Sequence, residues 1–180
     1  MLTITIPARE LYDEKQDLFI TIKGQTLQLE HSLVSLSKWE SKWHKPYISD
    51  KEKTYEETLD YIKCMTITQN VDPNVYKFLT EENIYQIKAY IDDPMTATTC
   101  SEPKSNKRDN RPITSELIYY WMIALQIPVE FQKWHLNRLL MLIKVCNAEN
   151  TPPKKGNRRE TINRYAALNE ARRKKLNSKG

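Results

Sequence analysis

The chain has 180 residues, of which 39% are hydrophobic and 28% charged, with 28 Lys and Arg, 23 Asp and Glu and only 3 Gly. This composition is typical of a globular domain with a core and argues against a chain that is disordered throughout. Charged residues interrupt every apolar run before the roughly 20 residues that a membrane-spanning helix needs, so we expect no membrane span. No Gly lies between residues 25 and 155, which excludes the glycine-rich loops that cradle nucleotide phosphates.

The net charge of +5 is unevenly distributed along the chain. Residues 151–180 hold ten Lys or Arg and two Glu, a net charge of +8, so residues 1–150 carry −3. We therefore predict a single globular domain over residues 1–150, followed by a basic tail over 151–180 that is either flexible or helical. A charge asymmetry of this kind is typical of an interaction tail.

The N-terminal part has the pattern of β-strands. Apolar and polar residues alternate over 2–6, 18–22 and 26–29, and Gly24 lies between the last two runs. A period of two with a glycine turn predicts a small antiparallel meander within residues 1–30.

From residue 32 the apolar spacing changes to the three and four of a helix, so residues 32–150 should be helical. All of these helices but the last should begin at a capping residue, because Ser, Thr and Asp side chains accept hydrogen bonds from free backbone N–H groups. The capping residues are Ser32, Thr54, Asp72, Thr80, and Thr114 or Ser115. Residues 94–112 are polar and lack periodicity, which predicts an inserted loop.

The last two of the expected helices differ in character from the others. Residues 117–125 are apolar all round, which predicts a helix in the centre of the core, and the next helix should run from Val129 to about Asn147. The fold class is thus α+β and mainly α, with the meander packed on a helical bundle.

Residues that could carry catalysis or hold a metal are scattered. His31, His44 and His135 lie far apart, and Cys64, Cys100 and Cys146 have no C-x-x-C spacing. The paired carboxylates stand mostly at helix starts or turns, and the helix dipole accounts for those at helix starts. We therefore predict no catalytic site, no metal site and no cofactor. Free cysteines and an N-terminus without the pattern of a signal peptide favour the cytoplasm.

The strongest candidates for partner binding are tryptophans that alternate with lysines. Trp39 and Trp43 are spaced by four residues, and Lys38 and Lys42 precede them. Aromatic rings among bases can stack on nucleobases or hold an apolar segment of another protein. The alternative interpretation is that the tryptophans belong to the core while the lysines face water.

The basic tail supplies the other candidates. It could neutralise nucleic-acid phosphates or contact an acidic protein surface, and of these two we favour protein contact. The tail residues concerned are Arg158, Arg159, Arg172, Arg173, Lys174 and Lys175.

Several segments resemble proteins of long-tailed bacteriophages. The segments are residues 29–46, 94–99, 120–125 and 132–140. Together they resemble the tail assembly chaperones of these phages, helical proteins that coat the tape-measure protein while the tail tube polymerises. The resemblance covers most of the chain and brings no catalytic motif.

The resemblance implies a non-enzymatic morphogenesis protein in the host cytoplasm, with the tape-measure protein or tail-tube subunits as partners. A homo-oligomer is compatible with this role. Two alternatives stay open: a structural tail or neck protein of the virion, and a nucleic-acid-binding accessory protein.

Overall fold

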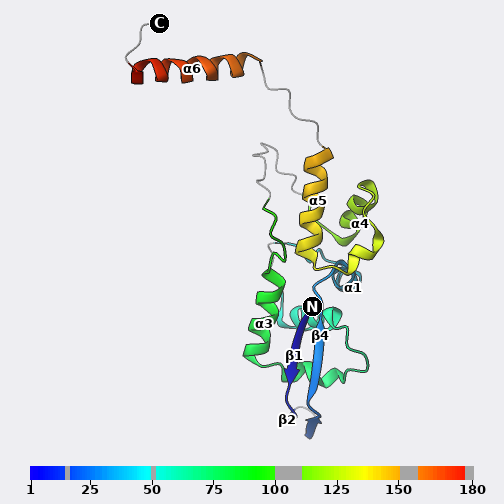
Figure 1. The fold of residues 1–180 in the computed structure, drawn as a ribbon. Helices are drawn as coiled ribbons and strands as arrows, with labels where there is room; N and C mark the ends of the chain where they lie inside the picture. Colours follow the sequence, from blue (N-terminus) through cyan, green and yellow to red (C-terminus); the bar gives the residue numbers. More distant parts are fainter. Residues whose placement is uncertain (15–16, 50–51, 100–110, 151–157, 177–180) are drawn as a thin grey trace. The chain divides into compact units, whose positions relative to one another are not determined.

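The computed structural model describes residues 1–14, 17–49, 52–99, 111–150 and 158–176 (Figure 1). The chain divides into two compact units, Met1–Ala148 and Glu149–Gly180, which are described separately below. We call the first unit the body. The described residues form an α+β fold that is mainly α, which confirms the predicted fold class.

The N-terminal strands form a nested pair of hairpins. β1 (Leu2–Ile6) pairs antiparallel with β4 (Gln25–Leu29), and β2 (Arg9–Asp13) pairs antiparallel with β3 (Leu18–Ile22). The predicted meander is therefore wrong in its pairing, because 18–22 pairs with a strand that the sequence pattern missed. Residues 9–13 read RELYD and lack a clear alternation, so periodicity alone could not identify them.

The two hairpins are separated where Pro7 and Ala8 pass Gly24. A Cβ atom at Gly24 would lie 3.1 Å from the backbone nitrogen of Ala8, tighter than most such contacts. Pro7 also lacks the N–H group that a continuous ladder would need. Close backbone approach thus explains both the glycine and the interruption of the ribbon.

Four helical elements follow, and their capping residues are those that the sequence predicts. α1 (Leu33–Trp43) begins after Ser32, α2 (Tyr55–Met65) after Thr54, the 3₁₀ helix η1 (Pro73–Phe78) after Asp72, and α3 (Glu81–Asp92) after Thr80. In each case the capping side chain accepts a hydrogen bond from a backbone N–H group of the first turn.

The last helices of the body differ from the prediction. α4 (Ser115–Ala124) begins after Thr114, but a 3₁₀ helix, η2 (Val129–Lys133), stands where one long helix was expected. α5 (Leu136–Asn150) begins three residues later. The chain is extended at Trp134, and His135 forms an antiparallel bridge with Ser32. The N–H group of Leu136 donates to His31 O at 2.7 Å, so pairing with a distant segment replaces the helix there.

Side chains at the start of α5 contact backbone carbonyl groups at the end of α3. The side-chain amide of Asn137 donates to the carbonyl oxygens of Ile91 and Asp93, at 2.8 and 2.9 Å. The His135 Nε2 atom lies 2.9 Å from the Tyr90 carbonyl oxygen. The Asn137 contacts satisfy carbonyl groups that the end of a helix leaves free, whereas Tyr90 O also accepts from the Asp93 N–H group at 3.3 Å.

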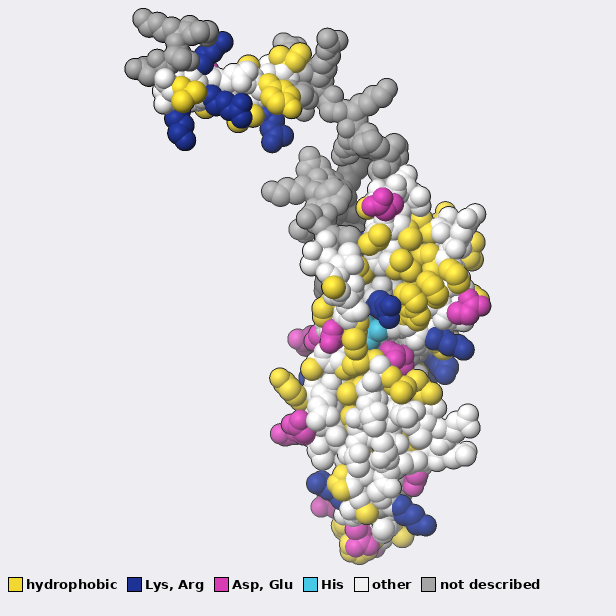
Figure 2. Space-filling view, in the orientation of Figure 1, with side chains coloured by type: hydrophobic (Ala, Val, Ile, Leu, Met, Phe, Trp, Pro, Cys, Tyr) yellow, Lys and Arg dark blue, Asp and Glu magenta, His cyan; other side chains and the backbone are white. Residues whose placement is uncertain are grey.

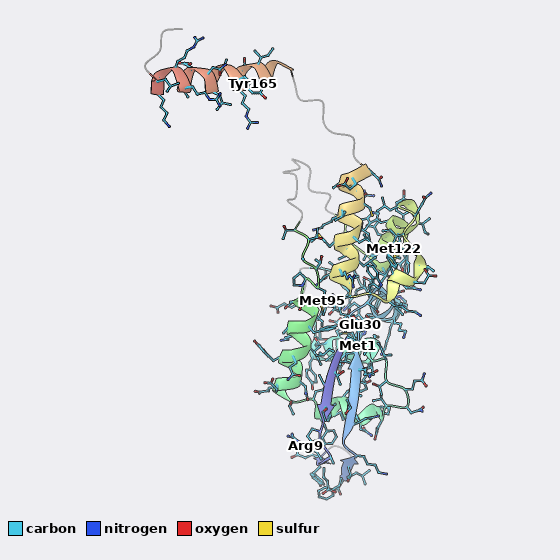
Figure 3. All side chains as sticks on the ribbon, in the orientation of Figure 1. Met1, Arg9, Glu30, Met95, Met122 and Tyr165 are labelled. Carbon is cyan, nitrogen blue, oxygen red and sulfur yellow. The ribbon has the colours of Figure 1, made fainter. Side chains whose placement is uncertain are left out.

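The body has two hydrophobic cores. The first lies between the β1–β4 sheet, α2, η1 and α3, and includes Trp39, Tyr61 and Ile87. The second lies among α1, α4 and α5, with Leu36, Ile118 and Leu139 at its centre. At one end of the first core the Met1 ammonium group pairs with Glu30, 3.1 Å away, and Figure 3 shows the two residues side by side.

The second unit contains α6 (Arg158–Leu176), which has 19 residues. Every side chain whose exposure is described, from Ile162 to Leu176, is exposed. The Tyr165 side chain projects from this helix in Figure 3.

Candidate functional site

Trp39 belongs to the first core. Its side chain is 1% exposed, and its Nε1 atom donates to the Glu57 carbonyl oxygen at 2.9 Å. The ring stacks on Trp43 at 6.1 Å and meets Tyr47 edge-on at 5.1 Å. The hypothesis that Trp39 offers its ring to a partner is therefore wrong, because spacing along a helix does not reveal which side another element covers.

Trp43 and Lys42 are engaged by a single carboxylate of α2. Trp43 Nε1 donates to Asp60 Oδ2 at 2.9 Å, and Lys42 Nζ pairs with Asp60 Oδ1. Burial alone would raise the pKa of Asp60, but the hydrogen bonds from Lys42 and Trp43 outweigh it and lower the pKa. Asp60 thus stays ionised and neutralises Lys42.

A second ion pair lies beside the first. Lys45 Nζ contacts Glu57 Oε1 at 2.6 Å, and the Thr54 N–H group donates to Glu57 Oε2 at 2.9 Å. These two hydrogen bonds, that of Lys45 first, lower the pKa of Glu57. The pairs fasten α1 and its C-terminal extension to α2, so this region is structural, with the half-buried Trp43 and the exposed Lys38 at its edge.

A cavity of about 470 Å³ opens next to these ion pairs. Its lining includes Trp39, Lys45, Lys53 and Glu57. Lys53 Nζ lies 4.4 Å from the centre of the Tyr47 ring, so the ring engages this cation. The two lysines that line the cavity thus already have partners in the body: Lys45 pairs with Glu57, and Lys53 lies over the Tyr47 ring.

A site that the sequence interpretation missed lies on α4. This helix was expected in the centre of the core, yet Tyr120 is 63% and Ile123 is 77% exposed. Only Ser115, Ile118 and Met122 of the helix are buried. The prediction failed because α1 and α5 cover one side of α4 alone. The sequence did contain a signal for this exposure. A helix that is apolar all round needs packing partners on every side, and a domain of this size has few helices that could cover it.

We call the outward apolar part of this helix the α4 surface. It consists of Leu117, Tyr120, Trp121, Ile123 and Ala124, of which Leu117 and Trp121 are half-buried. Glu116 lies at the N-terminal end of this surface and is the acidic residue of the first turn of α4. Figure 2 shows hydrophobic side chains gathered over the part of the body that α4 and α5 form.

An apolar groove adjoins the α4 surface at Trp121. The groove has a volume of about 430 Å³ and is lined mainly by Ile113, Trp121, Leu140, Met141 and Ile143. Asp92 and Lys144 stand among the lining residues as its charged members. Trp121 belongs to both the α4 surface and the groove, so the two apolar features adjoin on the body.

The tail candidates are on α6. Arg172, Arg173, Lys174 and Lys175 are exposed in its last turns, and Lys174 Nζ lies 2.9 Å from Glu170 Oε1. The backbone of Arg158 and Arg159 belongs to α6, but their side chains lie outside the described residues. The structure brings the described tail candidates together on one helix.

Two of the three histidines meet inside the body. The rings of His31 and His135 pack edge to face at 5.1 Å, and His31 Nδ1 lies 2.6 Å from the Tyr61 hydroxyl oxygen. Burial, with the neighbouring His135, lowers the pKa of His31 to about 3, and burial lowers that of His135. Both rings are therefore neutral at pH 7.

Over the described residues, no three His, Cys, Asp or Glu side chains lie close enough together to hold a metal ion. Cys64 and Cys146 are half-buried free thiols, and Cys100 lies outside the described residues. Within the described ranges, no helix is both long and apolar enough to cross a membrane.

Comparison of the chain with protein-family models, curated proteins and solved structures finds no match. The α4 surface, the adjoining groove and α6 are therefore interpreted from their own chemistry.

Proposed function

We propose that this protein is a non-enzymatic bacteriophage morphogenesis protein, a tail assembly chaperone that binds the tape-measure protein. The observation that carries the proposal is the exposure of Tyr120 and Ile123 on the most apolar helix of the body. Exposed apolar patches beside a groove are typical of surfaces that bind other proteins. The resemblance of residues 120–125 to tail assembly chaperones involves this same helix.

The dimensions of the α4 surface suit a helical partner. α4 has 10 residues and is about 15 Å long, which is about three turns of a partner helix lying alongside. An amphipathic helix could lay its apolar stripe along Tyr120 and Ile123 and insert one side chain into the groove near Trp121. Each copy covers only a short stretch, so coating a long tape-measure helix requires many copies.

The proposal is tested by expressing the tape-measure protein with and without the full chain. We expect soluble tape-measure protein, in complex with the chain, only when both are present. The Tyr120→Asp and Ile123→Asp double variant should lose this effect, since it places charge on the α4 surface.

A matched control uses two residues of the same types elsewhere on the body. Ile67 and Tyr85 are also exposed, so Ile67→Asp with Tyr85→Asp should keep the complex. Equal loss in both double variants, or no complex with the unmodified chain, would contradict the proposal. Stoichiometric amounts of the protein in purified virions would favour the structural tail or neck protein instead, because a chaperone leaves the finished particle.

A further inference from the structure

The α6 helix is a concentrated source of positive charge. Residues 158–176 hold seven Lys or Arg and two Glu, a net charge of +5 on 19 residues. All described side chains from Ile162 onward are exposed. Such a helix gains little from burial of its own surface, so its charge is the property through which it can bind a partner.

The cations surround α6 instead of forming one face. Successive residues of a helix point about 100° apart, so the four consecutive bases Arg172, Arg173, Lys174 and Lys175 encircle its last turns. Arg172 and Lys174 point about 160° apart, almost in opposite directions. Glu170 contacts Lys174, but this pair is exposed and weak.

This distribution discriminates among polyanionic partners. A membrane surface or a flat acidic protein surface meets one face of a helix, so a helix that binds there has cations and apolar residues on separate faces. On α6, Arg172 and Arg173 lie on the same side as Ile162 and Leu176, which rules out that separation. A helix in a nucleic-acid groove instead has a phosphate backbone on each side.

The geometry points to α6 as a helix that binds double-stranded DNA in the major groove, through phosphates on both walls. The groove is about 12 Å wide and accepts one α-helix, and 19 residues give a rod of about 28 Å, close to one helical turn of DNA. Arg and Lys contacts to phosphates fix position without reading sequence. The binding is therefore largely independent of DNA sequence.

The test measures binding of the full chain to a labelled duplex of about 20 base pairs by fluorescence anisotropy over a range of NaCl concentrations. Five phosphate contacts give a slope of about −4.5 for log K against log salt. Replacing Arg172, Arg173, Lys174 and Lys175 with Ala should lower the affinity by about 100-fold or more at about 0.1 M salt and make the slope shallower by about 3 to 4.

The matched control removes four exposed lysines from the body, by replacing Lys23, Lys63, Lys88 and Lys133 with Ala. This variant loses the same net charge as the quadruple α6 variant but keeps every cation of α6. Its affinity for the duplex should therefore stay within about threefold of that of the unmodified chain. Equal losses in the two quadruple variants would overturn the inference, because net charge and not α6 would then govern binding.

Two single variants test the groove itself. Arg172→Ala and Lys174→Ala remove cations that point in nearly opposite directions, and each should lower DNA affinity by about fivefold to tenfold. An effect confined to one of them indicates a flat partner surface and overturns the groove. Equal or tighter binding to duplex RNA also overturns it, since the major groove of RNA is too narrow for a helix. Tighter binding to anionic vesicles or to polyglutamate than to duplex DNA would likewise overturn the inference.

This inference goes beyond the proposed function and is independent of it. DNA binding depends on α6, whereas tape-measure binding depends on the α4 surface. The quadruple α6 variant and the Tyr120→Asp, Ile123→Asp variant therefore separate the two activities, and either can fail alone.

Discussion

The Oε2 atom of Glu40 accepts a hydrogen bond of 2.7 Å from the backbone N–H group of Ser115, 75 residues further along the chain. Its Oε1 atom accepts a second bond, of 2.8 Å, from the Tyr47 N–H group. Glu40 is buried, and Ser115 is the first residue of α4. A carboxylate at a helix N-terminus also interacts favourably with the helix dipole. One side chain of α1 thus fixes the position of the helix that carries the α4 surface.

We expect Glu40→Gln to destabilise the body by about 1 to 3 kcal/mol, because the amide can accept with only one of its two heavy atoms and leaves a buried N–H group unpaired. Urea unfolding followed by tryptophan fluorescence measures the change. The control Glu116→Gln removes an exposed carboxylate from the first turn of the same helix and should cost at most about 0.5 to 1 kcal/mol. Equal effects of the two substitutions would show that the pairing with Ser115 contributes little.

The stability of the body should fall as the pH is lowered through 6.5. Unfolding releases His31, whose pKa rises from about 3 in the folded chain to about 6.5. Between pH 6.5 and pH 3 the unfolded state therefore binds more protons than the folded state. The contribution of His31 to the free energy of unfolding is complete above pH 6.5 and is lost as the pH falls towards 3. Between pH 7 and pH 5 the loss from His31 alone is about 2 kcal/mol, and His135 adds to it.

Urea unfolding at the two pH values checks this dependence. His31→Gln should lower the stability at pH 7 and flatten the pH dependence, whereas His44→Gln, at an exposed position, should leave the dependence unchanged. If His31→Gln retained the full dependence, another group would be responsible for it.

Trp39→Ala should destabilise the body by about 3 to 5 kcal/mol, because it leaves a large cavity in the first core. It also removes the donor to the Glu57 carbonyl oxygen. Trp43→Ala should cost less because that ring is half-buried, and Lys38→Ala, on the exposed edge, should stay within about 0.5 kcal/mol. Thermal unfolding by circular dichroism ranks the three. A Trp39→Ala variant that is as stable as Lys38→Ala but loses partner binding would restore the original tryptophan hypothesis.

Removal of residues 151–180 should leave the stability of the body within about 0.5 kcal/mol of the full chain. The described side chains of α6 are all exposed, and the second unit begins at Glu149. The urea midpoint and slope of the truncated chain, compared with those of the full chain, provide the measurement. A clearly lower midpoint would mean that the second unit contributes to folding of the body.

Local signals in the sequence predict where helices begin. Ser32, Thr54, Thr80 and Thr114 each cap a helix because the interaction that selects them lies within three residues. No distant contact is needed to recognise them, so a sequence pattern suffices.

Distant contacts account for the errors. The partner of 18–22 depends on how the chain folds back at Gly24, and the break before α5 depends on the bridge between His135 and Ser32. Burial of Trp39 and exposure of Ile123 likewise depend on which neighbours α1 and α4 meet. A helical stripe tells which residues share a side, and the tertiary contacts decide whether that side is core or surface.

The position of α1 between two cores has a consequence for how the body opens. Leu33 and Leu36 belong to the second core, while Trp39, one to two turns later, belongs to the first. Because loss of either core removes support from α1, we expect the two cores to unfold together, and we expect the buried part of α1 to be among the best protected in hydrogen exchange. A defect in the β1–β4 sheet therefore lowers the population of molecules with an intact α4 surface, although the two features belong to different cores.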